Sequence, residues 1–427
     1  MRALPGPGPA ADLTQAALNA VTTHLPMVLL AAGAAALASF LLTPLAIRFA
    51  PRLGTIDQPG AERRIHKRPI PRSGGLAIAL AMVGVGAAGL LANQMLGFAP
   101  PLGAVRSQHV LGLFGGVAVG AILGYLDDRY ELRARWQFAG QLLLAGIAIF
   151  SGVLITNMVN PLGGSPLQFA GPAAMAVTTL WIIGMINSVN FIDGLDGLLT
   201  GIAVIGAITL GAVSLLIPPI QPAVAILCAL LAGALLGFLP YNFHPARVFL
   251  GTAGVFVIGY SLATLSVIGS AKIAVALLVL GVPIIDTFWI IVRRLSERRS
   301  PFSPDRGHFH HRLLDLGLSH SRAVLVIYAI CVVLAVLSLT LSGRGQISAF
   351  VIIVVVGGVA LYLLTRRAQG ALDRSSYPEE SEPGTLAELR DAVMEPAEER
   401  SEDRPDEPPE SPHQRTSVGV AGERGKT

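Results

Sequence analysis

Long apolar segments recur along most of the chain and constrain its fold more than any other feature. An α-helix of about 20 apolar residues is long enough to cross the hydrocarbon core of a bilayer. Eleven such segments are predicted, at residues 26–50, 74–97, 108–126, 136–155, 173–188, 197–217, 221–239, 254–270, 271–292, 322–341 and 347–365. The predicted fold is therefore all-α, a polytopic membrane protein with about eleven transmembrane helices.

The composition agrees with a membrane protein. Of the 427 residues, 52% are hydrophobic and 14% are charged, whereas soluble globular domains carry about 25% charged residues. The net charge of +4 is typical of basic cytoplasmic loops, so no nucleic-acid polymer is expected as a partner. Cys228 and Cys331 both lie within apolar segments, which makes a disulfide or metal framework improbable.

The distribution of Lys and Arg predicts the orientation in the membrane. Basic residues gather in the alternate loops 51–73, 127–135 and 293–321, and the intervening loops hold only Arg106 and Arg344. Basic loops stay in the cytoplasm, which predicts an outside N-terminus and a cytoplasmic C-terminus. The predicted domains are a short extracytoplasmic N-terminus (1–25), a transmembrane catalytic domain (26–365) and a cytoplasmic tail (366–427). The tail is rich in Glu, Asp, Arg, Pro and Ser, a composition typical of disorder.

Paired acids stand where one apolar segment ends. In "GYLDDRYELRARW", Asp127 and Asp128 precede an arginine cluster. They could simply be polar residues that end a helix in water. Alternatively, two adjacent carboxylates repel each other unless a cation neutralises them, and Mg²⁺ or the nearby arginines could do so.

A second polar cluster follows another apolar segment. "NSVNFIDGLDG" places Asn187, Asn190, Asp193 and Asp196 at three-residue spacing, which on a helix would form one stripe. Such a stripe at the end of a membrane span is costly unless it lines a hydrated cavity. A hydrogen-bond network inside the bundle is the alternative.

Basic clusters lie in two of the predicted cytoplasmic loops. "HFHH" supplies His308, His310 and His311 without the cysteines of a zinc site, and the arginines around them fit an anionic ligand better than zinc. An ordinary solvated basic loop is the alternative. "RRIHKRPIPRSGG" includes Lys67 and is either a topology determinant that attracts lipid headgroups or a phosphate site. Carboxylates and cations on one membrane face together predict magnesium-dependent phosphate chemistry at the cytoplasmic surface.

Five segments sharpen this prediction because they occur in the order known from one superfamily. They are "RRIHKRPIPRSGG", "GYLDDRYELRARWQ", "NSVNFIDGLDGL", "NFHPARVFLGTAG" and "SPFSPDRGHFHHRLLDLG". As a set they resemble the polyprenyl-phosphate N-acetylhexosamine-1-phosphate transferases over about residues 26–365. The phospho-N-acetylmuramoyl-pentapeptide branch typically has three consecutive histidines, whereas "HFHH" is more similar to the N-acetylglucosamine-1-phosphate transferases that initiate envelope glycans.

The resemblance implies a reaction and its participants. A polyprenyl phosphate, undecaprenyl or decaprenyl, would attack the β-phosphorus of UDP-N-acetylglucosamine and release UMP. The implied cofactor is Mg²⁺, with Mn²⁺ as an alternative. The implied location is the bacterial cytoplasmic membrane, with the site facing the cytoplasm, and a homodimer is a family-level expectation. The alternatives are the muramoyl-pentapeptide transferase and a non-catalytic protein that binds or transports lipid phosphate.

The same resemblance assigns roles to individual residues. The implied catalytic residues are Asp127, Asp128, His308, His310 and His311. The implied substrate-binding residues are Lys67, Asn187, Asn190, Asp193, Asp196, Asn242, Phe249 and Arg306. The implied metal ligands are Asp128, Asp193 and Asp196.

One position departs from the family pattern. Where the family usually reads Gly-Asp-(Ala/Ser/Thr)-Gly-Ser with a magnesium-binding Asp, this chain has Thr252 within Gly251-Thr252-Ala253-Gly254-Val255. A hydroxyl is a weaker magnesium partner than a carboxylate. Other acids could hold the metal, activity could be reduced, or the substrate or metal geometry could differ. Asp286 is a further candidate acid.

Overall fold

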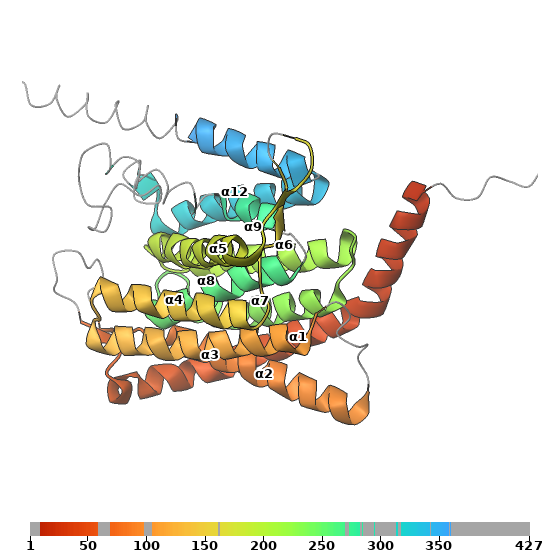
Figure 1. Cartoon of the computed structure of the whole chain (residues 1–427). Helices are drawn as coiled ribbons and strands as arrows, with labels where there is room; N and C mark the ends of the chain where they lie inside the picture. Colours follow the sequence, from red (N-terminus) through yellow and green to blue (C-terminus); the bar gives the residue numbers. More distant parts are fainter. Residues whose placement is uncertain are drawn as a thin grey trace, which may run out of the picture. The chain divides into compact units, whose positions relative to one another are not determined.

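The computed structural model describes residues 9–58, 69–97, 105–160, 163–269, 273–281, 317–341 and 343–357, with single positions at 284, 294, 313, 314 and 359. The helices are α1 (Pro9–Leu53), α2 (Gly74–Leu96), α3 (Ser107–Tyr130), α4 (Ala134–Phe150), α5 (Gly171–Ile192), α6 (Leu198–Leu216), α7 (Pro222–Asn242), α8 (Gly251–Ile268), α9 (Ile273–Val279) and α12 (His320–Thr340) (Figure 1). A further apolar helix spans Gly343–Gly357. The predicted tail, 366–427, lies outside the described residues.

Eight helices among the described residues are long and apolar enough to cross a membrane: α2, α3, α5, α6, α7, α8, α12 and the Ala17–Leu53 part of α1. The prediction of an all-α polytopic membrane protein is therefore confirmed. Of the other predicted spans, 136–155 corresponds to the shorter α4, and 347–365 overlaps the helix Gly343–Gly357. Within the predicted span 271–292, the labelled helix among the described residues is α9 (Ile273–Val279).

In the described part of the chain, the strands form two antiparallel ribbons, and each strand has two residues. In the first, β1 (Ile56–Asp57) pairs with β2 (Ile70–Pro71), with Asp57 opposite Ile70. In the second, β3 (Asn157–Met158) pairs with β4 (Leu167–Gln168). The first ribbon matters for the site, because it connects the end of α1 to the start of α2.

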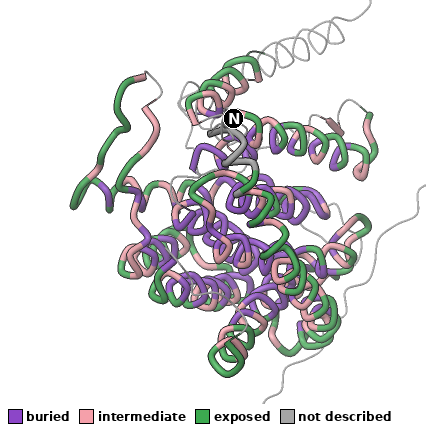
Figure 2. Tube along the Cα trace, turned by 90° about the vertical axis from the view of Figure 1, so that its right-hand side faces the viewer, coloured by how far each residue is buried: buried purple, intermediate pink, exposed green. Residues whose placement is uncertain are grey.

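The helices pack through small residues. Figure 2 shows buried positions gathered where helices face one another and exposed positions on the outward faces. A Cβ on Gly233 or Gly237 of α7 would lie 2.1 or 2.0 Å from the carbonyl oxygen of Ala32 or Ala36 of α1. Small residues four apart let backbones approach closely, which is the usual basis of helix association in lipid.

Close packing at glycine also brings α2, α3 and α8 together at one end of the bundle. A Cβ on Gly75 of α2 would lie 2.0 Å from the backbone nitrogen of Gly254 of α8. A Cβ on Gly124 of α3 would lie 2.2 Å from the Cα of Ala253 of α8. Because these backbones touch, the end of α3, which carries the paired acids, lies directly against the start of α8.

Backbone hydrogen bonds join the neighbouring loops to this junction. Phe249 donates to the Pro71 carbonyl at 2.8 Å and accepts from the Gly74 amide at 3.0 Å. The side chain of Asn242, at the end of α7, donates to the Val248 carbonyl at 3.0 Å. The segment between α7 and α8 is thereby held against the first ribbon, and the ends of several helices enclose one hollow.

Candidate active site

A cavity of about 470 Å³ lies at this junction. Its acidic, basic and other polar lining residues are Asp57, Arg72, Asp128, Asn190, Asp193, Asp196, Asn242, His244, Thr252 and His320. Phe249, Leu250 and Val255 contribute apolar wall. The structure thus brings together six of the predicted site residues, namely Asp128, Asn190, Asp193, Asp196, Asn242 and Phe249, with Thr252 beside them.

Asp128 holds the N-terminus of α8. Its Oδ1 accepts from the backbone amide of Thr252 at 2.9 Å, and its Oδ2 accepts from that of Ala253 at 3.2 Å. A helix N-terminus has unpaired N–H groups and a partial positive charge, both of which favour a carboxylate. Gly251 has φ +67°, and a Cβ there would lie 2.5 Å from Oδ2 of Asp128. Glycine is therefore required where this carboxylate meets the helix.

Asp127 has a different environment from its neighbour, although both are almost buried. It accepts a hydrogen bond from Gln137 Nε2 at 2.9 Å and another from the hydroxyl of Thr252 at 2.7 Å. Asp128 lines the cavity, whereas Asp127 is not among the residues that line it. The two adjacent acids are thus divided: Asp128 faces the cavity and Asp127 supports the wall behind it.

Asp193 lies immediately after α5, which ends at Ile192. Asp193 is an exposed residue, and it lines the cavity. Removal from bulk water by the surrounding protein, followed by the negative charges of Asp128 and Asp196, raises the pKa of the Asp193 carboxyl to about 7. Clustered carboxylates that raise one another's pKa are a set of oxygen donors that a hard cation could bind.

The predicted helical stripe is wrong for the second half of its residues. Asn187 and Asn190 lie on α5, but Asp193 and Asp196 lie in the turn after it. Gly197 in this turn has φ +79°, a conformation that favours glycine and does not continue a right-handed helix. Asn187 does not line the cavity. Its amide nitrogen donates to Gln141 Oε1 and to the Ile183 carbonyl, both at 2.8 Å.

Asp196 belongs to a histidine cluster that the sequence interpretation missed. Its Oδ2 lies 2.8 Å from His244 Nδ1 and accepts from the Ala246 amide at 3.1 Å. The His244 ring stacks on that of His320, at the start of α12, with centroids 4.2 Å apart and planes inclined by 15°. Ligand atoms of the three residues lie within 4.8 Å of one another. However, nearly parallel rings do not converge on one metal ion, so the arrangement is better described as a hydrogen-bonded stack.

Asn242 and Phe249, two of the implied substrate-binding residues, both line the cavity. Asn242 is buried, and its side-chain oxygen accepts from Thr200 Oγ1 at 2.6 Å while its nitrogen bonds Val248. Its observed contacts thus hold the segment that carries Phe249. The predicted residues Lys67, Asp286, Arg306, His308, His310 and His311 lie outside the described residues, so their roles stay predictions.

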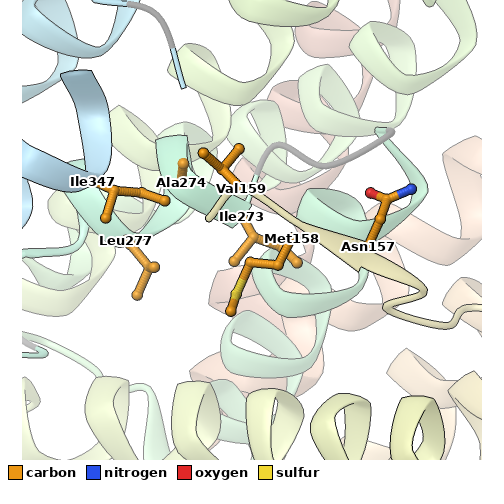
Figure 3. A pocket seen from close by; sticks show the side chains of 7 residues that line it. All are labelled: Asn157, Met158, Val159, Ile273, Ala274, Leu277 and Ile347. Carbon is orange, nitrogen blue, oxygen red and sulfur yellow. The ribbon is translucent and has the colours of Figure 1, made fainter. Parts of the chain in front are cut away.

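Two other hollows are chemically different. A small one of about 20 Å³ lies beside β3 and α9 and is lined mostly by apolar side chains, with Asn157 as its polar residue (Figure 3). A larger one of about 540 Å³, between α1, α2, α3 and α7, has a largely apolar lining without Asp or Glu. Neither has the carboxylates of the junction cavity, which is therefore the candidate active site.

The helices and this cavity define the class: an integral membrane protein with a carboxylate-rich site at the ends of its spans. Residues 110–270 match the sequence model described as Glycosyl transferase family 4. The chain belongs to this family, because a curated relative of 35% identity covers 74% of it.

Three relatives illustrate the family. The first is named "Probable undecaprenyl-phosphate N-acetylglucosaminyl 1-phosphate transferase" in Bacillus subtilis, and the match, 35% identical, covers 74% of this chain and 86% of the relative. A "Decaprenyl-phosphate N-acetylglucosaminephosphotransferase" of Mycobacterium tuberculosis is 35% identical, with 79% and 89% covered. A "Phospho-N-acetylmuramoyl-pentapeptide-transferase" of Desulforudis audaxviator is 32% identical, with 74% and 99% covered.

Proposed function

We propose that this protein transfers N-acetylglucosamine-1-phosphate from UDP-N-acetylglucosamine to a polyprenyl phosphate, undecaprenyl or decaprenyl, and releases UMP. The product would initiate a cell-envelope glycan. The observation that carries the proposal is the convergence of Asp128, Asp193 and Asp196 on one cavity. The family membership and the names of relatives at 35% identity support the choice of reaction.

The proposed reaction is a displacement at phosphorus. An oxygen of the lipid phosphate forms a bond to the β-phosphorus, the bond from that phosphorus to the α-phosphate bridging oxygen breaks, and UMP leaves. A phosphate monoester is largely ionised near neutral pH, so a strong base has little to remove. The chain's task is then to hold the two phosphates in line and to offset their charge.

Magnesium is the proposed cofactor, with Mn²⁺ as an alternative, and Asp128, Asp193 and Asp196 are its proposed ligands. When bound, the ion would neutralise negative charge on the phosphates. The raised pKa of Asp193, which comes first from its removal from bulk water and then from the negative charges of Asp128 and Asp196, is consistent with a cation here, because a bound cation would offset those charges. Thr252 Oγ1 donates to Asp127, so this position supports an existing carboxylate and adds none.

The proposed location is the bacterial cytoplasmic membrane with the cavity facing the cytoplasm. The support is the basic bias of loops 51–73 and 127–135, because Asp57 and Arg72 of the first loop and Asp128 of the second line the cavity. The N-terminus would then lie outside and the C-terminus inside. A homodimer stays an expectation from the resemblance.

The test is UMP release by purified protein with undecaprenyl phosphate and Mg²⁺. UDP-N-acetylglucosamine and UDP-N-acetylmuramoyl-pentapeptide are supplied separately, each with a radiolabelled sugar. Labelled lipid with UMP from the first substrate alone is the expected result. Label from the pentapeptide alone would support the muramoyl branch, whose relatives are 32% identical. Lipid binding without UMP release from either substrate would support a non-catalytic binder.

A further inference from the structure

An ion pair lies in the cavity wall beside the first ribbon. Arg72 Nη2 donates to Asp57 Oδ1 at 2.7 Å, and both residues line the cavity with Asp128. Asp57 lies on β1, and Arg72 follows β2 directly. The ribbon therefore fixes the two backbones next to each other, and the side chains meet inside the cavity wall.

The pair is not needed to hold the ribbon. The Arg72 amide already donates to the Thr55 carbonyl at 2.8 Å, and Pro71 accepts from Phe249 at 2.8 Å. Asp57, in contrast, is only 6% exposed, and a nearly buried carboxylate is costly unless it is paired. The carboxylate of Asp57 is therefore buried at a free-energy cost, although the ribbon does not need it. This indicates that its role is to hold the guanidinium of Arg72.

Arg72 is well placed to meet a substrate. About 29% of its side chain is exposed, and among the described residues that line the cavity it is the sole permanent cation. A guanidinium has five N–H donors, and the bond to Asp57 uses one of them. Its positive charge also acts on the carboxylate of Asp128.

We propose that Arg72 binds a phosphate group of the substrate in this cavity and that Asp57 is a positioning residue that fixes the plane of the Arg72 guanidinium. Phosphate oxygens suit the planar fork of arginine better than the point charge of lysine. Asp57 restrains the fork on one side, so that less rotational freedom is lost when phosphate binds. This inference rests on the proposed function, which supplies two phosphate sources: the lipid phosphate and the nucleotide diphosphate.

The experiment compares Arg72→Lys, Asp57→Asn and their combination, in full-length purified protein with Mg²⁺, by steady-state UMP release. KM is measured for each substrate with the other at saturation, beside the melting temperature. We expect Arg72→Lys to raise KM about tenfold, the loss of about one charge-assisted hydrogen bond, while kcat changes less. A rise in KM for polyprenyl phosphate assigns Arg72 to the lipid, and a rise for the UDP-sugar assigns it to the diphosphate.

Asp57→Asn keeps a side-chain oxygen that can accept the bond but removes the charge, so we expect a smaller rise in the same KM. The double variant should be no worse than Arg72→Lys, because Asp57 acts through Arg72. Arg52→Lys is the matched control, since Arg52 is exposed on α1 and packs over Phe49; both of its KM values should equal those of the wild type.

Three results would overturn the inference. Unchanged KM values in Arg72→Lys would remove Arg72 from phosphate binding. A lower melting temperature with both KM values unchanged would show a structural pair alone. Additive effects of the two substitutions would show that Asp57 does not act through Arg72. Wild-type protein that releases no UMP would instead refute the proposed function. In that case, thermal shifts with polyprenyl phosphate and UDP-N-acetylglucosamine, for wild type and Arg72→Lys, would still decide whether Arg72 binds phosphate.

Discussion

The hydroxyl of Thr252 donates a hydrogen bond of 2.7 Å to Oδ2 of Asp127 and so ties the start of α8 to the end of α3. The family resemblance leads us to expect an acid at this position. We therefore predict that Thr252→Asp places a second carboxylate against Asp127, because like charges at this distance repel unless a cation lies nearby. Turnover should depend more steeply on Mg²⁺, and the melting temperature without Mg²⁺ should fall.

Two matched variants separate charge from shape in that experiment. Thr252→Asn has nearly the size of Asp without its charge, and Thr252→Ser keeps the hydroxyl donor. Neither should acquire the steeper magnesium dependence. An unchanged magnesium titration in Thr252→Asp would show that position 252 does not sense the metal.

The two adjacent acids should respond differently to loss of charge. Asp128→Asn is predicted to abolish transfer, because Asp128 lines the cavity. It should also lower the melting temperature, since an amide nitrogen would face one of the backbone N–H groups of α8, and an unsatisfied buried donor costs about 1–3 kcal/mol. Asp127→Asn should fold normally, because the Thr252 hydroxyl can accept from the new amide, and should lose less turnover. Wild-type turnover in Asp128→Asn would remove this residue from the mechanism.

The raised pKa of Asp193 predicts a pH-dependent affinity for magnesium. With a pKa of about 7, the carboxyl is mostly protonated at lower pH, and a cation must displace that proton to bind. Magnesium affinity should therefore rise between about pH 6 and about pH 8 and then level off. Calorimetric titration of the purified protein measures this, and Asp193→Asn should flatten the curve. Equal affinities at both ends of the range in the wild type would contradict the assignment.

The contact between α3 and α8 predicts a steric effect of one methyl group. A Cβ on Gly124 would lie 2.2 Å from the Cα of Ala253, and overpacking of this kind typically costs about 1–3 kcal/mol. Gly124→Ala should lower the melting temperature and displace Asp128 from α8, so turnover should fall too. Gly115→Ala on the same helix is the control, because nothing lies within 4 Å of its Cβ position. Equal melting temperatures for the two variants would refute the close contact.

The fold was largely predictable, because lipid requires each span to satisfy its own backbone hydrogen bonds. Each span is therefore a helix encoded by a long apolar segment that can be recognised locally in the sequence. The segments 74–97 and 108–126, for example, correspond to α2 and α3. The end of α5 was harder to predict. The three-residue spacing through Asp196 continues a helical pattern, but the backbone leaves the helical conformation at Asp193, with φ −75° and ψ 48°, so the helix ends at Ile192.

The candidate site was predictable as a set of polar residues and much less as a set of contacts. The acids stood out because they interrupt apolar sequence. The pairing of His244 with Asp196, which are 48 positions apart, and of Thr252 with Asp127, which are 125 apart, depends on how the helix ends meet. Asp57 gave no signal because one acid in a polar loop is ordinary. Its importance comes from the ribbon that places it beside Arg72.

The bonds from Asp128 to the amides of Thr252 and Ala253 have a practical consequence for observing the site. A cation or substrate that interacts with the Asp128 carboxylate from inside the cavity would also change the polarisation of those two amides. The chemical shifts and hydrogen-exchange rates of these two amides would thus report occupancy of the cavity, without a label on either substrate. The first turn of α8 would serve as a built-in sensor in a membrane protein whose reactants are difficult to follow directly.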